Sequence, residues 1–372
     1  MQRMSLILLA CLAAGIGCIV ASADDRPAPP SLAQSFAPPA EYANDFGRYR
    51  SPLLFDGGRP VKTPQDWRQR RREILDYWHG ALGAWPPLLD KPRVEFVSKE
   101  PRENFTQHKV RVEVARDVLQ DGYLLVPNAQ GKHPAVFVPF YEPETSIGTN
   151  PKSTLRDFAY QLVKRGFVAL SVGSPNNDAR KPDTSQVQCQ PLSYLAYIAA
   201  NCHTVLAQHP QVDPNRIGVV GHSYGGKWAL FASCLYDKYA AAVWCDPGIV
   251  FDETRSNVNY WEPWYLGRDP TLTRKPGVIT KDNPRTGPYK TLFESGHDLH
   301  ELHVLMCPRP FLVSGGSEDP PSRWQALNHS VAVNDLLGVK NRVAMTNRPT
   351  HSPTVESNEQ IYRFFEHFLG SK

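Results

Sequence analysis

A serine between two glycines, directly after a short apolar run, constrains this chain more than any other feature of its sequence. Residues 217–220 have the composition of a buried strand, residues 221–225 are Gly-His-Ser-Tyr-Gly, and residues 227–233 have helical character. Glycine has no Cβ, so the backbone can turn sharply between the strand and the helix without a steric collision. The pattern therefore predicts a strand, a tight turn and a helix, with the hydroxyl of Ser223 raised above the sheet.

Strand-like and helix-like patterns alternate on both sides of this turn. We expect strands over 93–98, 109–114, 123–126, 134–140, 167–172, 217–220, 240–244, 310–314 and 342–344, and helices over 73–82, 155–165, 191–208, 227–233, 323–337 and 359–369. Such alternation predicts an α/β fold with a mostly parallel central sheet and helices on both faces. The first strands are expected to be antiparallel at the N-terminal edge. The irregular, aromatic-rich segment 248–295 is expected to be a long insertion after the strand that ends near Trp244.

The first residues have the pattern of a secretory signal. Arg3 supplies a positive charge, residues 6–20 are apolar, and Ala-Ser-Ala at 21–23 is typical of a cleavage site. The apolar run is shorter than a typical membrane span. We therefore expect a signal peptide over 1–23 with cleavage after Ala23, a Pro-rich segment over 24–40, and one domain over 41–372. The mature protein is expected to be secreted or periplasmic, without stable membrane association.

Charge and cysteine content exclude several other classes of protein. The 372-residue chain has a formal net charge of +4, with acidic and basic residues mixed along it, so no nucleic-acid partner is expected. No C-x-x-C pattern is present. The cysteines after the signal are Cys189, Cys202, Cys234, Cys245 and Cys307. Their spacing selects no disulfide pairing, and an odd number leaves at least one unpaired.

A histidine-rich segment is the strongest competing signal, because it has spacing that could suit a metal. His297, His300 and His303 are three residues apart, but the segment does not match H-E-x-x-H. We interpret it as the polar face of a helix, and we expect neither a metal nor a cofactor.

Several segments resemble those of a known superfamily. They are Asp-Pro-Asn-Arg-Ile-Gly at 213–218, the glycine-flanked serine, Pro-Arg-Pro at 308–310 and Gly-Gly-Ser-Glu-Asp at 315–319. From about residue 135 onward, the chain resembles α/β-hydrolases of the dienelactone hydrolase, prolyl oligopeptidase and acetyl xylan esterase group. The turn also resembles that of glucuronoyl esterases, in which a lysine follows the serine at the spacing of Lys227. Those enzymes have Cys and Arg where this chain has His222 and Tyr224.

The resemblance implies a catalytic triad in the chain order serine, acid, histidine. A serine hydroxyl is a poor nucleophile unless a base accepts its proton and an acid orients that base. We expect Ser223 as the nucleophile and His351, in the loop before the last helix, as the base. Asp319 is our preferred acid, and Asp246, one strand earlier, is the alternative.

Further residues are expected around the triad. The backbone N–H groups of Tyr224 and Tyr141 are candidates for an oxyanion hole. Lys227 is either a substrate contact or a solvated helix lysine. Trp261 and Trp264 either pack in a small core or stack against sugar rings, and His222 is expected to pack beneath the turn.

These observations predict a secreted serine hydrolase that cleaves carboxylic esters of acylated or esterified carbohydrate through an acyl-enzyme intermediate. Its partner would be a small-molecule or polysaccharide ester. One alternative is a peptidase of the prolyl oligopeptidase type, although the segment before the first core strand is too short for a propeller domain. The other is a catalytically silent hydrolase fold that serves in binding.

Overall fold

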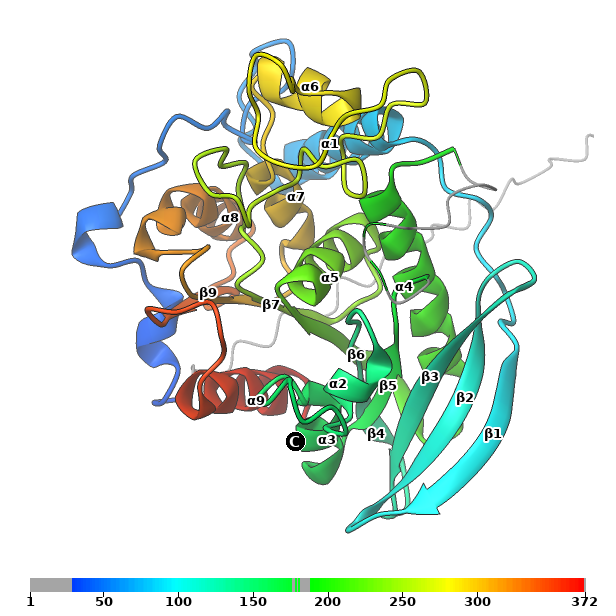
Figure 1. The fold of residues 1–372 in the computed structure, drawn as a ribbon. Coiled ribbons are helices and arrows are strands. Elements are labelled where there is room, and N and C mark those ends of the chain that lie inside the picture. The colour runs from blue at the N-terminus through cyan, green and yellow to red at the C-terminus, as the bar shows by residue number, and fades with distance from the viewer. Residues whose placement is uncertain (1–28, 176–177, 179, 181–187, 371–372) are drawn as a thin grey trace, which may run out of the picture.

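A computed structural model describes residues 29–175, 178, 180 and 188–370, and its centre is a nine-stranded sheet (Figure 1). The strand order is β1-β2-β3-β5-β4-β6-β7-β8-β9. The strands are β1 (Val94–Pro101), β2 (Phe105–Ala115), β3 (Val118–Pro127), β4 (His133–Phe137), β5 (Val168–Val172), β6 (Val212–His222), β7 (Ala241–Cys245), β8 (Phe311–Gly315) and β9 (Val343–Asn347). The predicted signal peptide 1–23 lies outside the described residues.

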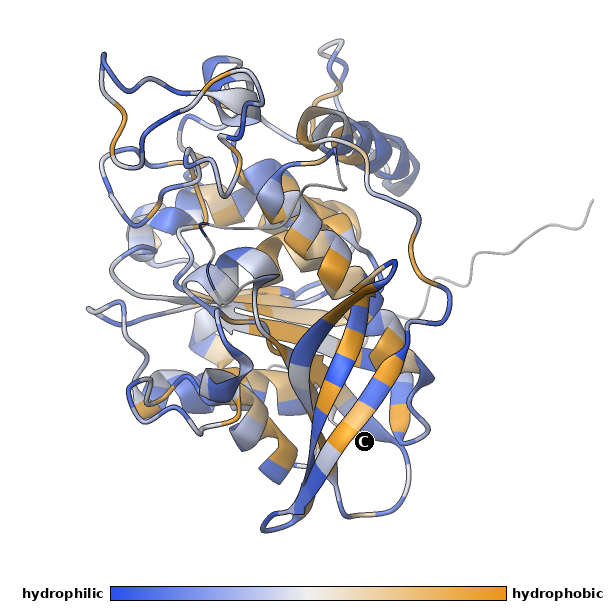
Figure 2. Ribbon diagram, turned by 45° about the vertical axis from the view of Figure 1, so that its right-hand side comes forward, coloured by the Kyte–Doolittle hydropathy of each residue, from blue (hydrophilic) through white to orange (hydrophobic). Residues whose placement is uncertain are grey.

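The sheet is antiparallel at its N-terminal edge and parallel elsewhere, as predicted. β1 to β3 pair as antiparallel neighbours, β3 pairs antiparallel to β5, and every pair from β5 to β9 is parallel. Figure 2 shows polar and apolar residues alternating along the strands of this antiparallel edge, which has one face packed on the core and the other exposed. The central strands are buried on both sides, which is why they appear in the sequence as continuous apolar runs.

Helices cover both faces of the sheet. The helices are α1 (Pro64–Leu82), α2 (Pro143–Ser146), α3 (Phe158–Lys164), α4 (Pro191–Gln208), α5 (Tyr224–Leu235), α6 (Gly287–Glu294), α7 (His300–His303), α8 (Trp324–Leu336) and α9 (Val355–Leu369). α4, α5 and α8 pack on one face and α3 and α9 on the other (Figure 1). Successive strand residues therefore enter different cores: Trp244 of β7 belongs to the first cluster and Val243 to the second.

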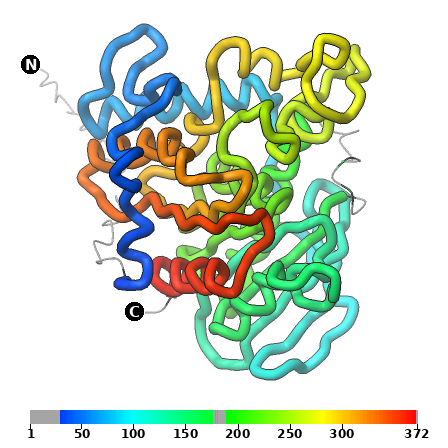
Figure 3. The backbone as a smooth tube through the Cα atoms, turned by 60° about the vertical axis from the view of Figure 1, so that its left-hand side comes forward, coloured from blue at the N-terminus to red at the C-terminus, as the bar shows by residue number. Residues whose placement is uncertain are grey.

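The segment before the sheet wraps around this framework. Short 3-10 helices, η1 (Ala33–Phe36) and η2 (Ala40–Tyr42), lead to α1. Figure 3 shows this part of the chain, in blue, beside α8 and α9. The amide of Asn328 in α8 donates to the carbonyls of Tyr42 and Asp45 at 2.8 and 2.7 Å. Because both carbonyls are bonded, the wrapping segment has a defined path over the C-terminal helices.

The first helix contains the predicted helical residues 73–82 and begins at Pro64. Thr63 and Asp66 form a reciprocal capping box, and proline occupies the first helical position. Trp67, Ile74 and Trp78 on one face of α1 are buried. Among the charged positions between them, Arg68 and Arg72 are exposed, whereas Arg70 is buried and pairs with Asp56 at 2.8 Å. Because charged residues interrupt the apolar positions, apolar composition alone underestimates the length of this helix.

The predicted insertion 248–295 lies between β7 and β8 and carries α6, and α7 and a 3-10 helix, η4 (Val304–Met306), follow it before β8. Tyr260, Trp261 and Tyr289 within it are fully buried. The cysteines 189, 202, 234, 245 and 307 are all buried and free. In the described part of the chain, no helix is both long and apolar enough to cross a bilayer.

Candidate active site

The turn at Ser223 has the sharp geometry that its glycines predict. β6 ends at His222 and α5 begins at Tyr224, so Ser223 alone joins them, with φ 55° and ψ −114°. Such a conformation is strained for a residue with a side chain. A Cβ on Gly221 would lie 2.1 Å from the carbonyl oxygen of Gly225. The glycines thus allow the chain to present the Ser223 hydroxyl at the end of the sheet.

His351 contacts the hydroxyl of Ser223 from a different loop. It lies in the turn between β9 and α9, and its Nε2 is 2.8 Å from Oγ of Ser223. The side chain is 28% exposed, so the pair is open to solvent on one side. The distance allows direct proton transfer from the serine to the imidazole.

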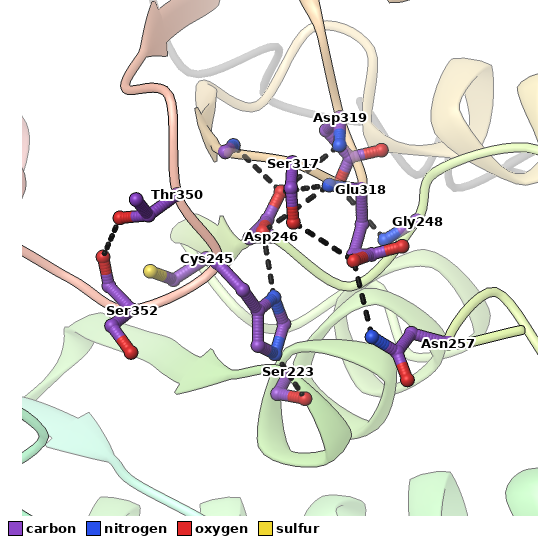
Figure 4. Close-up of polar contacts among 12 residues, drawn as sticks. Ser223, Cys245, Asp246, Gly248, Asn257, Ser317, Glu318, Asp319, Thr350 and Ser352 are labelled. Atoms are coloured by element: carbon purple, nitrogen blue, oxygen red, sulfur yellow. Dashed lines mark hydrogen bonds and ion pairs between the residues drawn. The ribbon is translucent and has the colours of Figure 1, made fainter. Parts of the chain in front are cut away.

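The acid beside His351 is Asp246, the alternative of the sequence analysis, and not the preferred Asp319. Nδ1 of His351 is 2.7 Å from Oδ2 of Asp246, which directly follows β7 and is fully buried (Figure 4). The structure therefore brings Asp246, His351 and Ser223 into one continuous chain of hydrogen bonds.

Asp319 points away from His351 and binds backbone amides instead. Its carboxylate accepts hydrogen bonds from the amides of Gly248 at 2.8 Å and Ile249 at 2.6 Å. Burial and the nearby charge of Asp246 raise the pKa of Asp319 to about 6. Its contacts support the first residues of the insertion, directly after Asp246.

The turn that contains Asp319 also supports Asp246 through its backbone, a contribution that the sequence analysis missed. Oδ1 of Asp246 accepts hydrogen bonds from the amides of Gly316 at 2.6 Å, Glu318 at 3.2 Å and Asp319 at 2.9 Å. A Cβ on Gly316 would lie 2.6 Å from Oδ2 of Asp246. The two glycines at 315–316 are the sequence signal for this support, because glycine pairs indicate that another group approaches the backbone closely.

Glu318 lies near this network without contacting His351. Its Oε1 accepts from the amide of Asn257 at 3.3 Å and the hydroxyl of Ser317 at 2.9 Å (Figure 4). Among the described residues, potential metal-ligand atoms of Asp246, Glu318 and His351 lie within 4.8 Å of one another. Both ring nitrogens of His351 already face Asp246 and Ser223. This hydrogen-bonding pattern therefore favours acid–base chemistry at His351 over metal ligation.

The histidines of segment 297–303 have separate protein contacts. His297 bonds to Glu301 at 2.7 Å, and His300 bonds to the carbonyl of Arg50 at 2.7 Å. His303 is buried, with its ring 5.2 Å from that of Trp244. These contacts support packing against the core.

The two residues proposed for the oxyanion hole lie side by side. Tyr224 begins α5, and its ring stacks on that of Tyr141 with centroids 4.4 Å apart. The loop before Tyr141 approaches the turn closely, since a Cβ on Gly225 would lie 2.3 Å from the carbonyl oxygen of Pro139. The structure brings these segments together at Ser223, and the role of their N–H groups stays a prediction.

Lys227 is neither solvated nor directed toward open surface. Its side chain is buried, and its ammonium contacts the carbonyl of Pro247 and, at 3.3 Å, that of Asn257. It also lies 4.5 Å from the ring centroid of Tyr260. Burial lowers the pKa of Lys227 to about 8. The lysine therefore ties α5 to the start of the insertion.

Three aromatic residues have different surroundings. Trp261 is fully buried and its indole donates to the carbonyl of Gly277 at 2.9 Å, so it is a core residue. Trp264 is half-buried and packs edge-on against Tyr265. His222 packs beneath the turn, with its ring 4.6 Å from that of His351, and burial holds its pKa well below the usual range.

Comparison with known proteins supports the fold. Residues 195–277 match the family described as BAAT / Acyl-CoA thioester hydrolase C terminal. No curated protein matches the chain. A glucuronoyl esterase from Solibacter usitatus has a similar structure, with TM-score 0.66 and 19% identity, over 86% of this chain and 97% of that one. The chain has the α/β-hydrolase fold.

Two other esterases show the same likeness. A promiscuous CE15 esterase from a marine bacterial metagenome has TM-score 0.63 and 16% identity, covering 86% of this chain and 96% of that one. A glucuronoyl esterase from Sporotrichum thermophile has TM-score 0.57 and 16% identity, covering 88% and 90%. The fold implied by the resemblance is confirmed, and the structural likeness to glucuronoyl esterases extends beyond the turn to most of the fold.

Proposed function

We propose that this protein is a serine hydrolase of carboxylic esters that works through Ser223, His351 and Asp246. One observation carries the proposal: the unbroken hydrogen-bond chain from the buried Asp246 carboxylate through His351 to a serine on a strained strand-to-helix turn. Nucleophile, base and orienting acid in this geometry perform acyl transfer on many unrelated folds.

The contacts suggest the role of each residue in the reaction. Oγ of Ser223 attacks the ester carbonyl while Nε2 of His351 accepts the serine proton. The resulting oxyanion would lie against the N–H groups of Tyr224 and Tyr141. The imidazolium then protonates the departing alcohol, leaving an acyl-enzyme. Water, deprotonated by the same imidazole, attacks the acyl carbon. The imidazolium then returns the proton to Oγ of Ser223 as the acyl–oxygen bond breaks, and the carboxylic acid is released.

Asp246 would fix the tautomer of His351. Its carboxylate accepts a hydrogen bond from Nδ1–H and keeps the proton on that nitrogen, so Nε2 is left with the lone pair that the serine proton requires. Three backbone amides on its other oxygen prevent the carboxylate from rotating away. Asp246 is fully buried, so water does not compete for the bond.

We infer that the substrate is an esterified carbohydrate and that the protein acts after export. The half-buried Trp264 packs against Tyr265, whose ring centroid lies 6.3 Å from that of Tyr224, and similar structures include proteins named as glucuronoyl esterases. The predicted signal peptide supports export. A peptidase of the prolyl oligopeptidase type is disfavoured because the described segment before β4 forms α1 and three strands of the same sheet.

A panel of substrates tests this proposal. Acetyl, feruloyl and methyl-glucuronoyl esters, an acyl-CoA thioester and a prolyl arylamide would be assayed with wild type and Ser223→Ala. We expect ester hydrolysis to exceed the other activities and to fall by roughly 10⁴-fold or more in the variant. Unchanged hydrolysis of a chromogenic acetate by Ser223→Ala would overturn the proposal. Failure of folded wild type to react with a fluorophosphonate would favour the binding-protein alternative.

A further inference from the structure

Arg348 is buried beneath the turn that carries His351. It follows β9 directly, and its side chain turns inward, leaving the residue 8% exposed. Nη2 donates to the carbonyl of His351 at 2.7 Å, and Nε donates to the carbonyl of Ser352 at 2.8 Å. The guanidinium therefore holds the backbone of the histidine from below.

The other side of the same guanidinium is anchored in the sheet. Nη1 donates to the carbonyls of Ser314 at 2.9 Å and Gly315 at 3.2 Å, both at the end of β8. Nη2 also lies 3.6 Å from Sγ of Cys245, the residue immediately before Asp246. One rigid group thus connects the histidine turn to the strand ends beside the acid.

The chemistry of arginine suits this connection. Its planar guanidinium presents five N–H donors in fixed directions, whereas a lysine presents one ammonium on a flexible stem. The contacts described above are to neutral groups, and no ion pair with another described residue offsets the cost of burying the charge. A role limited to filling the core would be served equally well by an apolar side chain.

We propose that Arg348 is a positioning residue that sets the distance between His351 and Ser223. This inference rests on the proposed hydrolase function. Asp246 and Ser223 contact only the imidazole, and Arg348 holds the main chain from which that ring projects. Without the guanidinium, the turn at 348–352 keeps the backbone bond from the amide of Arg348 to the carbonyl of Gly315 at 3.1 Å, but it loses the side-chain bonds that join it to β8.

The experiment compares Arg348→Gln and Arg348→Lys with wild type. A misplacement of about 1 Å at a reacting group can cost about 10²-fold in rate. We therefore expect kcat for a chromogenic ester to fall about 10- to 100-fold in Arg348→Gln, with KM within about threefold of wild type. Arg348→Lys should recover part of the loss. The rate constant of fluorophosphonate labelling should fall in parallel, while the final fraction of labelled protein stays near that of wild type.

Arg309 provides a matched control. It precedes β8 at the opposite end of that strand, and its guanidinium also donates to carbonyls, those of Tyr239 at 2.9 Å and Leu305 at 3.0 Å. Arg309→Gln should lower the melting temperature without slowing the labelling of folded molecules. Destabilisation alone lowers the amplitude of labelling, whereas a displaced base lowers its rate.

The outcomes separate this inference from the proposed function. If wild type lacks hydrolysis that depends on Ser223, the function fails. If wild type is active and folded Arg348→Gln reacts as fast as Arg309→Gln, only the positioning role is overturned. Failure of both Arg348 variants to fold would also overturn it, because the arginine would then be needed for the fold itself.

Discussion

Replacing Asp246 and Asp319 one at a time by asparagine tests which carboxylate serves His351. In Asp246→Asn, the amide oxygen would replace Oδ1 as acceptor for Gly316, Glu318 and Asp319. The NH₂ group would then face Nδ1 of His351. Two donors cannot share one hydrogen bond, so Nδ1 would have to be the acceptor and the proton would move to Nε2. An imidazole in that tautomer cannot accept the proton of Ser223.

The magnitude follows from this tautomer change. The same exchange of aspartate for asparagine in a serine protease triad lowers kcat by about 10⁴-fold, and we expect a similar loss here. That factor corresponds to about 5 kcal/mol of transition-state stabilisation. Asp319→Asn does not touch His351, so kcat should stay within about tenfold of wild type. Its unfolding free energy should fall by about 1–2 kcal/mol, because one of the two amides at Gly248 and Ile249 loses its acceptor and the other keeps only a neutral one.

The assay is steady-state hydrolysis of a chromogenic acetate near pH 7.5, with rates divided by the folded fraction from circular dichroism. Ser223→Ala supplies the background rate, and urea unfolding supplies the stability change. A loss in Asp319→Asn equal to or larger than that in Asp246→Asn would refute the assignment of Asp246. Near-normal kcat in both variants would show that neither carboxylate orients the base.

Three further predictions concern the surroundings of the triad. Gly225→Ala should lower kcat about 10²-fold or more, because the new Cβ would displace the loop that carries Tyr141; a normal kcat measured by ester hydrolysis would contradict this. Lys227→Met should leave KM within about threefold of wild type, since the ammonium contacts carbonyls and not open surface; a much higher KM would show that it binds substrate. Burial raises the pKa of Asp298 to about 7 in the folded protein. Between about pH 4 and 7 the folded state therefore keeps the proton that the unfolded state loses, and the contribution of Asp298 to the free energy of unfolding falls as pH rises. Urea unfolding should therefore show Asp298→Asn gaining up to about 3 kcal/mol relative to wild type between pH 5 and 8, and an unchanged difference would contradict this.

Features that depend on neighbouring residues in the chain were predictable from the sequence. The strand-to-helix turn follows from the glycines beside Ser223, because a Cβ on Gly221 would collide with the carbonyl of Gly225 within the turn itself. The helix over 191–208 was predicted at its observed bounds, because proline marks its first turn and its apolar run is continuous. The alternation of strands and helices likewise indicated the parallel sheet, since parallel strands require crossover connections.

Features that depend on distant segments needed the tertiary structure. Asp246 and Asp319 both follow buried strands, and β7 and β8 are parallel neighbours, so both carboxylates arrive at the same edge of the sheet. Their order in the sequence cannot show which one faces His351. The direction of each side chain is set by backbone amides contributed from the other loop, which bind Oδ1 of Asp246 and both oxygens of Asp319.

The same distinction applies to the residues expected to bind substrate. Lys227 has the spacing of a ligand contact, but the carbonyls of Pro247 and Asn257 occupy its ammonium. Trp261 has the flat aromatic ring that could stack against a sugar, but the insertion folds around this ring and buries it fully. The sequence by itself determined the nucleophile turn, because that conformation depends on residues next to Ser223 in the chain. Only the tertiary structure decided which aspartate contacts His351 and what Lys227 and Trp261 contact, because the partners of these side chains come from loops far away in the chain.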